Sequence, residues 1–113
     1  MMAPAKKYDV LLTAGAEQDI EAIYKFIAEY DCAGHADYVL DQIYAVVENL
    51  AHLPERGSYP KELLDLGIKE YRQVAFKPYR IIYRITEQRV IIYLIADDRR
   101  NLQGILNRRL LRG

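Results

Sequence analysis

The spacing of apolar residues changes once along this chain, from steps of three and four to steps of two. Between residues 14 and 30 the apolar positions recur at three- and four-residue steps, which predicts an amphipathic helix. The same spacing returns between residues 36 and 53, and Pro54 follows directly. Gly34 is expected to separate the two helices, which would then form an antiparallel hairpin. The two stripes consist of Ile20, Ile23, Tyr24, Ile27 and Tyr30, and of Ala36, Val39, Leu40, Ile43, Val47, Leu50 and Leu53.

Strands are predicted on both sides of this hairpin. Residues 8–13 favour a strand, and Thr13 is placed to cap the first helix. After a loop over residues 54–67, with one helical turn at 61–66, a period of two predicts strands at 68–76, 79–85 and 89–96. A last helical segment is expected after Asp97 or Asp98. The predicted fold class is α+β, in the order β-α-α-β-β-β, with the helical hairpin on one face of a small, mainly antiparallel sheet and a short C-terminal helix.

The short connections between the last three strands decide which side chains share a face of the sheet. With a two-residue loop at Lys77-Pro78 and a three-residue loop over 86–88, Phe76 pairs with Tyr79, and residue 85 pairs with residue 89. The face expected to carry the helical hairpin holds Val74, Phe76, Tyr79, Ile81, Tyr83, Ile85, Ile91, Tyr93 and Ile95. The other face holds Tyr71, Gln73, Ala75, Arg80, Ile82, Arg84, Val90, Ile92 and Leu94. This second face is either a site for an anion or a partner chain, or a face covered by the C-terminal helix.

Composition narrows the class of protein. The 113 residues are 51% apolar and 28% charged, which is typical of a soluble protein with one domain, here residues 1–113. No window approaches the length of a membrane span, so we expect a cytoplasmic protein with no membrane partner. The single Cys32 cannot form an internal disulfide, and the two histidines, His35 and His52, do not resemble a zinc site. We therefore expect neither a metal nor a cofactor.

The net charge of zero conceals an uneven distribution. Residues 1–55 carry three basic and ten acidic groups, whereas residues 56–113 carry thirteen basic and six acidic groups. Such asymmetry is typical of a basic surface for nucleic acid or for an acidic partner. It is equally compatible with two halves that attract each other within one fold.

The order of elements and three stretches near the end of the chain resemble a known group of proteins. The stretches are "YRIIYRI", "VIIYLIADDRR" and "NLQGILNRRLL". Together with the strand, helical hairpin and three-stranded meander, they resemble the RelE/ParE superfamily of type II toxin-antitoxin toxins over essentially the whole chain. The resemblance implies a compact α+β fold and a cognate antitoxin that wraps the toxin.

Members of the superfamily act by one of two mechanisms, and the residues at the nuclease positions of this chain bear on the choice between them. RelE-like members cut mRNA on the ribosome without metal, whereas ParE-like members poison DNA gyrase. The resemblance places the nuclease arginines at Arg80 and Arg100, but the two lysine positions fall on Tyr71 and Gln73, and the tyrosine position falls on Leu106. Cleavage needs cations on the phosphate and groups that exchange protons. A catalytic set of Arg80, Arg100 and Tyr71 therefore applies only if the chain is a nuclease, with Lys69 or Lys77 within reach only in another register.

A ParE-like toxin is the preferred hypothesis, with an mRNA endonuclease and a degenerate toxin that only binds its antitoxin as alternatives. The partners implied are a cognate antitoxin and either DNA gyrase or the ribosome with mRNA. An apolar groove with cationic edges would suit an acidic amphipathic segment of the antitoxin. The predicted partner-binding residues are Arg84, Ile82, Ile92, Leu94, Arg99, Leu102, Ile105 and Leu106.

Overall fold

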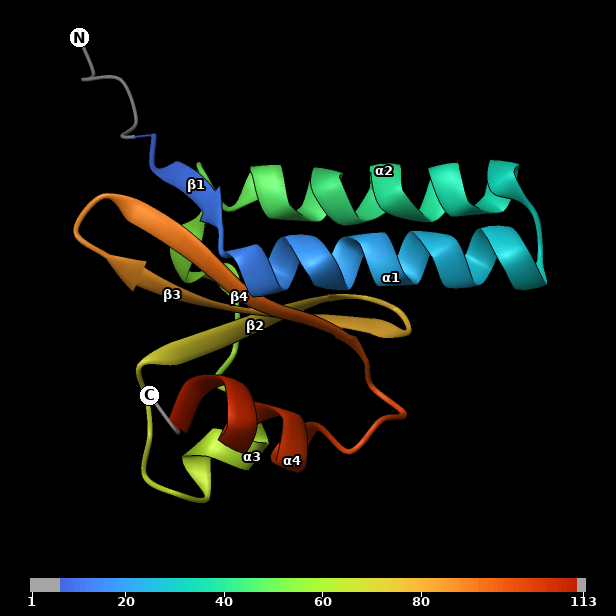
Figure 1. Cartoon of the computed structure of the whole chain (residues 1–113). Helices are drawn as coiled ribbons and strands as arrows, with labels where there is room; N and C mark the ends of the chain where they lie inside the picture. The colour runs from blue at the N-terminus through green and yellow to red at the C-terminus, as the bar shows by residue number, and fades with distance from the viewer. Residues whose placement is uncertain (1–6, 112–113) are drawn as a thin grey trace, which may run out of the picture.

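The computed structural model describes residues 7–111, and the fold is of the predicted α+β class. Two long helices lie side by side over one face of a twisted sheet, and short helices lie beneath the other face (Figure 1). The elements in chain order are β1 Asp9–Leu12, α1 Ala14–Tyr30, α2 Ala33–Asn49, a 3₁₀ turn Pro54–Arg56, α3 Lys61–Leu64, β2 Tyr71–Phe76, β3 Tyr79–Thr86, β4 Arg89–Asp97, α4 Leu102–Leu106 and a π-helical turn Asn107–Leu111.

The sheet has the order β1-β4-β3-β2, with β1 parallel to β4 and the other pairs antiparallel. The β2–β3 register is the predicted one, because Phe76 pairs with Tyr79 across the Lys77-Pro78 loop. Strand β1 pairs with β4, and α1 follows it after the single residue Thr13. There, Thr13 caps the helix by accepting a hydrogen bond from the backbone N–H of Ala16 at 3.1 Å.

The helical hairpin covers one sheet face, as predicted. Its buried side chains pack on those of the strands in one cluster: Ala16, Ile20, Ile27, Ala36, Val39, Ile43, Val47, Leu50, Ile81, Tyr83, Val90, Ile92 and Ile95. Two details of the hairpin were predicted wrongly. Gly34 lies inside the first turn of α2 and the break falls at Asp31, because Cys32 caps α2 by accepting from the N–H of His35. Leu53 and Tyr30 are exposed rather than packed.

The face assignment of β4 was wrong for its first half, because the loop before it is one residue shorter than predicted, and a bulge restores the predicted faces further along. Thr86 pairs with Arg89, so the loop has two residues and not three, and Glu87 adopts a positive φ of 56° in it. The register then shifts at Tyr93, which inserts one extra residue before Leu94. Val90 and Ile92 consequently face the helical hairpin, while Tyr93 packs on the opposite side. Beyond the bulge, Leu94 and Ile95 lie on the predicted faces.

The opposite face carries a second hydrophobic cluster. Short helices α3 and α4 cover it, and α4 begins at the cap Asn101 rather than at Asp97 or Asp98. The prediction that Ile82, Ile92 and Leu94 form an open groove is wrong, since all three are fully or almost fully buried. The buried members of the second cluster are Leu63, Tyr71, Ile82, Leu94, Ala96, Leu102, Ile105 and Leu106. Of the two alternatives for this face, coverage by the C-terminal segment is confirmed.

Candidate functional site

Arg80 leaves the sheet on the side away from the helical hairpin, as predicted, but its guanidinium group is already occupied. Arg80 Nη1 and Nη2 donate to the two carboxylate oxygens of Glu62 at 2.7 and 2.8 Å, and Nε donates to Gln73 Oε1 at 2.7 Å. The side chains of Arg80 and Glu62 are only 17% and 24% exposed. A bidentate pair of this kind is short and specific. Arg80 is therefore shielded by α3 from any anion in solution.

The pair perturbs the carboxyl group as well. Hydrogen bonding from Arg80 lowers the pKa of Glu62 below its ordinary value, against the opposing effect of burial. Glu62 consequently stays ionised at neutral pH and neutralises Arg80 there. An incoming phosphate would have to displace this carboxylate before it could reach the guanidinium group.

Tyr71 is buried and packs its ring edge against Tyr93, with ring centroids 5.5 Å apart. Burial raises the pKa of the Tyr71 hydroxyl, and the neighbouring Tyr93 raises it further. A tyrosine in such surroundings keeps its proton at neutral pH, so it is a poor general base. Tyr71 shares the second hydrophobic cluster with Ile82 and Leu94, as a packing residue.

Arg100 lies at the far end of β4, in a different cavity from Arg80. A cavity of about 310 Å³ is lined by Asp19, Leu94, Arg100, Ile105, Arg108 and Arg109. Arg80 instead lines a cavity beside Gly57 and Gln73. Arg80 and Arg100 thus line different cavities, and Tyr71 lines neither of the two. Whether they serve catalysis stays an untested prediction.

Asp19 of α1 joins three parts of the chain. Its carboxylate accepts two hydrogen bonds from Arg109, at 2.9 and 3.1 Å, and a third from the backbone N–H of Ile95 at 2.9 Å. Arg109 also donates to the carbonyl oxygen of Tyr93 at 3.0 Å. The carboxylate raises the pKa of Arg109. Asp19 and Arg109 therefore hold the C-terminal segment against α1 and the edge of β4.

The predicted partner-binding residues divide into an exposed and a buried group. Ile82, Ile92, Leu94, Leu102, Ile105 and Leu106 are buried in the two clusters, so the structure offers none of them to a partner. Arg84 and Arg99 remain accessible, and so does the neighbouring Arg100, which was predicted as a nuclease residue. Arg84 lies 3.6 Å from Glu70, and Arg99 binds the carboxylate of Asp97. The binding role of all of these residues stays a prediction.

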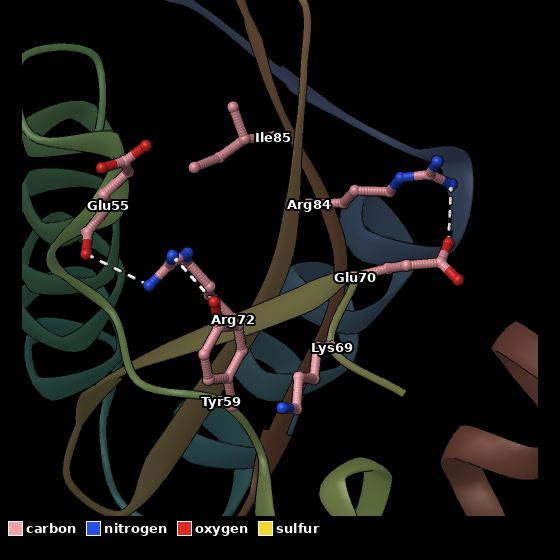
Figure 2. A pocket seen from close by; sticks show the side chains of 7 residues that line it. All are labelled: Glu55, Tyr59, Lys69, Glu70, Arg72, Arg84 and Ile85. Atoms are coloured by element: carbon pink, nitrogen blue, oxygen red, sulfur yellow. Dashed lines mark hydrogen bonds and ion pairs between the residues drawn. The ribbon is translucent and has the colours of Figure 1, made fainter. Parts of the chain in front are cut away.

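A further cavity, of about 380 Å³, lies where β2 begins (Figure 2). Arg72 stacks over the ring of Tyr59 with its guanidinium carbon 4.7 Å from the ring centroid, and it donates to the carbonyl oxygen of Gly57 at 2.9 Å. Arg84 points toward Glu70 on the other side of the strand. Lys69 lines this cavity, so it does not share the surroundings of Arg80. The cavity is lined by both acidic and basic side chains, and Arg72 is held by its hydrogen bond to the loop at Gly57.

Two properties of the described residues complete the chemical inventory. Within residues 7–111, no three His, Cys, Asp or Glu side chains gather closely enough to hold a metal ion. None of the helices in that range combines the length and apolar character needed to cross a membrane.

Comparison with known proteins assigns the family. A family model described as the ParE toxin of type II toxin-antitoxin system, parDE, matches residues 10–102. The chain belongs to the ParE toxin family. It is 25% identical over 100 residues to Toxin ParE3 of Caulobacter vibrioides (strain ATCC 19089 / CIP 103742 / CB 15), a match that covers 88% of this chain and 96% of the relative.

Solved structures share the fold. The chromosomal ParDE toxin-antitoxin system from P. aeruginosa contains a chain similar to this one, with a TM-score of 0.69, 19% identity, and coverage of 81% of this chain and 97% of that chain. A chain of the toxin-antitoxin complex RelBE2 from Mycobacterium tuberculosis has a TM-score of 0.61 and 18% identity, with coverage of 83% and 94%. The expected resemblance to the RelE/ParE superfamily is confirmed, and the match to the ParE family model agrees with the preferred hypothesis of a ParE-like chain.

Glu62 and Asp19 are the residues of this ParE-family chain that sequence reasoning missed. Glu62 lies 18 positions before its partner Arg80, and Asp19 lies 90 positions before Arg109. The two partners of each pair lie in different elements, so no local pattern indicates the pairing. The one available signal was the uneven charge of the two halves, because Asp19 belongs to the acidic half and Arg109 to the basic half.

Proposed function

We propose that this ParE-family toxin inhibits growth in the cytoplasm by poisoning DNA gyrase, and that a cognate antitoxin neutralises it. The family supports the toxin role, and the name of the P. aeruginosa neighbour describes a toxin-antitoxin system. The choice of gyrase over mRNA rests on one observation. In a nuclease, Arg80 would hold the scissile phosphate. Here its guanidinium group is already hydrogen-bonded to Glu62 and Gln73.

Chemical requirements of RNA cleavage explain why this observation matters. A nuclease of the RelE kind must neutralise the developing charge on phosphorus and must move protons at the attacking and leaving oxygens. Here, Arg80 is neutralised by a carboxylate with a lowered pKa, and the hydroxyl of Tyr71 has a raised pKa. An inhibitor that binds gyrase needs neither group, because it acts through its surface.

Exposed cations are the candidates for contact with the target. The fold leaves accessible the two predicted partner-binding arginines, Arg84 and Arg99, together with the adjacent Arg100. Arg100 and Arg99 follow β4 directly and lie on the basic half of the molecule. We propose that this end of the molecule approaches gyrase.

The test compares the two targets with the same purified protein. Under the proposal, the toxin added to gyrase, DNA and ATP produces cleaved DNA, and its induction in cells triggers filamentation and the SOS response. Cleavage of mRNA on ribosomes without DNA breakage would replace the proposal with the nuclease. Absence of any growth defect would identify a degenerate toxin that only binds its antitoxin.

A double substitution makes the comparison sharper. Arg80→Ala combined with Arg100→Ala should abolish toxicity under the nuclease hypothesis while a folded protein remains. Under the gyrase hypothesis, Arg80→Ala alone should reduce toxicity no more than its effect on stability explains, because Arg80 has no contact with the target. Circular dichroism of each variant supplies the folding control.

A further inference from the structure

Four arginines gather where β4 leads into the C-terminal segment, on the side of the sheet away from the helical hairpin (Figure 1). Two of them, Arg99 and Arg109, each donate to an aspartate carboxylate at 2.9 Å. The other two, Arg100 and Arg108, are exposed, and neither forms a salt bridge with a carboxylate of residues 7–111. This end of the molecule therefore keeps two cations that the described part of the fold does not neutralise.

Both of these cations line the same cavity of about 310 Å³, together with Arg109, Asp19, Leu94 and Ile105. The only carboxylate among these lining residues, that of Asp19, is already bonded to Arg109. Asp97 lies near Arg100, but its pKa is lowered mainly by a hydrogen bond from Arg99 and less by the charge of Arg100. The cavity is therefore strongly cationic, and its excess charge lies on Arg100 and Arg108.

Gly104 allows the guanidinium group of Arg108 to lie next to the cap of α4. A Cβ atom at Gly104 would lie 3.5 Å from Arg108 Nη1 and 3.1 Å from Asn101 Nδ2, so the two nitrogens lie close to the same point. Asn101 Oδ1 accepts from the N–H of Gly104 at 3.2 Å, and the nitrogen left beside Arg108 can only donate. Two donors in this arrangement are stabilised by an acceptor that binds both. We call Arg100, Asn101 and Arg108 the Arg100–Arg108 site.

The number of donors favours a phosphate over a carboxylate as the ligand. The carboxylate of Asp19 is satisfied by the single guanidinium group of Arg109 and one backbone N–H. The Arg100–Arg108 site offers two guanidinium groups and an amide, and a tetrahedral phosphate presents acceptor oxygens to several donors at once. Among the described residues that line the cavity, none is aromatic, so a base has no ring on which to stack. The ligand that fits is therefore the phosphate of a nucleic acid backbone.

The site is suited to binding a phosphate and not to cleaving it. Cleavage needs a group that takes up a proton in the transition state. Arginines keep their protons at neutral pH, and both carboxylate oxygens of Asp19 already accept hydrogen bonds from Arg109. Contact at this site would therefore be electrostatic and reversible.

We propose that the Arg100–Arg108 site binds a backbone phosphate of the DNA that gyrase holds. The proposal rests on the proposed function, which supplies gyrase as the target, and it adds the DNA as a second surface that the toxin contacts. Since phosphates carry no sequence information, this contact is independent of DNA sequence. It weakens as the salt concentration rises, because binding releases counterions from the DNA.

Fluorescence anisotropy of a labelled duplex DNA, titrated with the intact toxin at low and at moderate salt, tests the phosphate contact. We expect Arg100→Gln and Arg108→Gln each to weaken binding about fivefold or more, and to reduce the slope of log affinity against log salt concentration by about one. Arg89→Gln is the matched control, because it removes one exposed positive charge at the opposite end of β4. It should change the affinity by less than about twofold.

Gly104→Ala distinguishes a shaped site from an effect of net charge. The variant keeps every charge, but its Cβ crowds Asn101 Nδ2 and Arg108 Nη1. We expect it to weaken DNA binding about threefold, the equivalent of one lost hydrogen bond. Equal melting temperatures establish that the variants are folded. Wild-type affinity in Gly104→Ala together with equal losses in all three arginine variants would overturn the proposal.

DNA cleavage by gyrase, measured with the same variants, separates this proposal from the proposed function. Support for both is cleavage that falls in Arg100→Gln and Arg108→Gln in step with their DNA affinity. If all variants stimulate cleavage and bind DNA equally, or if the wild type binds no DNA, the phosphate site is wrong while gyrase remains the target. Site-dependent DNA binding without any cleavage by gyrase would refute the gyrase target and leave the phosphate site standing. Tighter binding of a single-stranded RNA of equal length would assign the site to RNA instead.

Discussion

At the scale of single residues, the two arginines of β3 have different tasks although they stand two positions apart on one face. Arg80 is held by Glu62 and Gln73 and is mostly buried, whereas the side chain of Arg84 is 41% exposed and 3.6 Å from Glu70. A partly buried ion pair with several hydrogen bonds is costly to break, because one charge is left without a partner. An exposed pair contributes little. The two pairs therefore form a natural test and control.

Glu62→Gln should lower the free energy of unfolding by about 1.5–3 kcal/mol, the size expected for hydrogen bonds to a charged group. Glu70→Gln should change it by less than about 0.5 kcal/mol, as for other exposed pairs. Urea unfolding at pH 7 measures both. Equal effects of the two substitutions would contradict the assignment of Arg80 to a closed structural pair.

The contribution of Glu62 should also depend on pH in a defined direction. Its pKa is lower in the folded protein than the ordinary value of 4.5. The stabilisation is therefore fully present above about pH 4.5 and is lost as the pH falls through the lowered value. The difference between wild type and Glu62→Gln should shrink below pH 4.5 and stay constant from pH 6 to 8.

At the scale of elements, the loop before α3 is fastened to the sheet by one buried tyrosine. Tyr83 of β3 donates to the carbonyl of Pro54 at 2.6 Å and accepts from the N–H of Gly57 at 3.1 Å. Ser58 and Gln73 then exchange two backbone hydrogen bonds across the edge of β2. The lack of a side chain at Gly57 allows this approach, because a Cβ atom there would lie 2.5 Å from the Tyr83 hydroxyl and 2.6 Å from the Gln73 carbonyl.

Gly57→Ala should therefore destabilise the protein by about 2 kcal/mol or more, as overpacking does in a rigid surrounding. The backbone of Gly57, with φ −75° and ψ 156°, suits any residue, so the effect is steric. Gly34→Ala is the matched control, since a Cβ there meets nothing within 4 Å and the position lies in α2. It should stabilise by about 0.5–1 kcal/mol. Thermal unfolding of both variants measures the two changes in stability. A similar loss of stability in both would contradict the steric explanation.

Local patterns predicted the elements well but not their departures from regularity. The repeat of apolar residues located α1, α2 and the three meander strands, because each element buries one face. The bulge at Tyr93 was invisible, since an inserted residue changes the faces of β4 without altering its apolar run. The spacing of Tyr30 predicted a core position, but its side chain is exposed. Helix α1 is longer than the sheet face on which it packs, so its last turn extends beyond the sheet (Figure 1). The pairing of Arg80 with Glu62 could not be predicted because it joins two separate elements.

At the scale of the whole molecule, the sheet is the middle layer between two hydrophobic clusters, and charge follows the layers. Most acidic groups of residues 1–55 lie on the helical hairpin, while most basic groups of residues 56–111 lie on the sheet and the C-terminal segment. Asp19 and Arg109 connect the two halves by a bidentate ion pair. This pair is one contact of the kind expected if the two halves attract each other, and the exposed Arg99 and Arg100 remain for a partner.

Truncation after Arg100 should show that the second cluster is part of the core. It removes α4 and with it Leu106, which is fully buried, and it uncovers Ile82 and Leu94. Each large apolar side chain returned to water costs about 1.5–3 kcal/mol, so the loss of several contacts approaches the whole stability of a small protein. We expect a chain that aggregates, binds a hydrophobic dye and lacks a cooperative thermal transition. A soluble truncated chain with an unchanged melting temperature would mean that α4 is an accessory tail, and the face around Ile82 would again qualify as a docking surface.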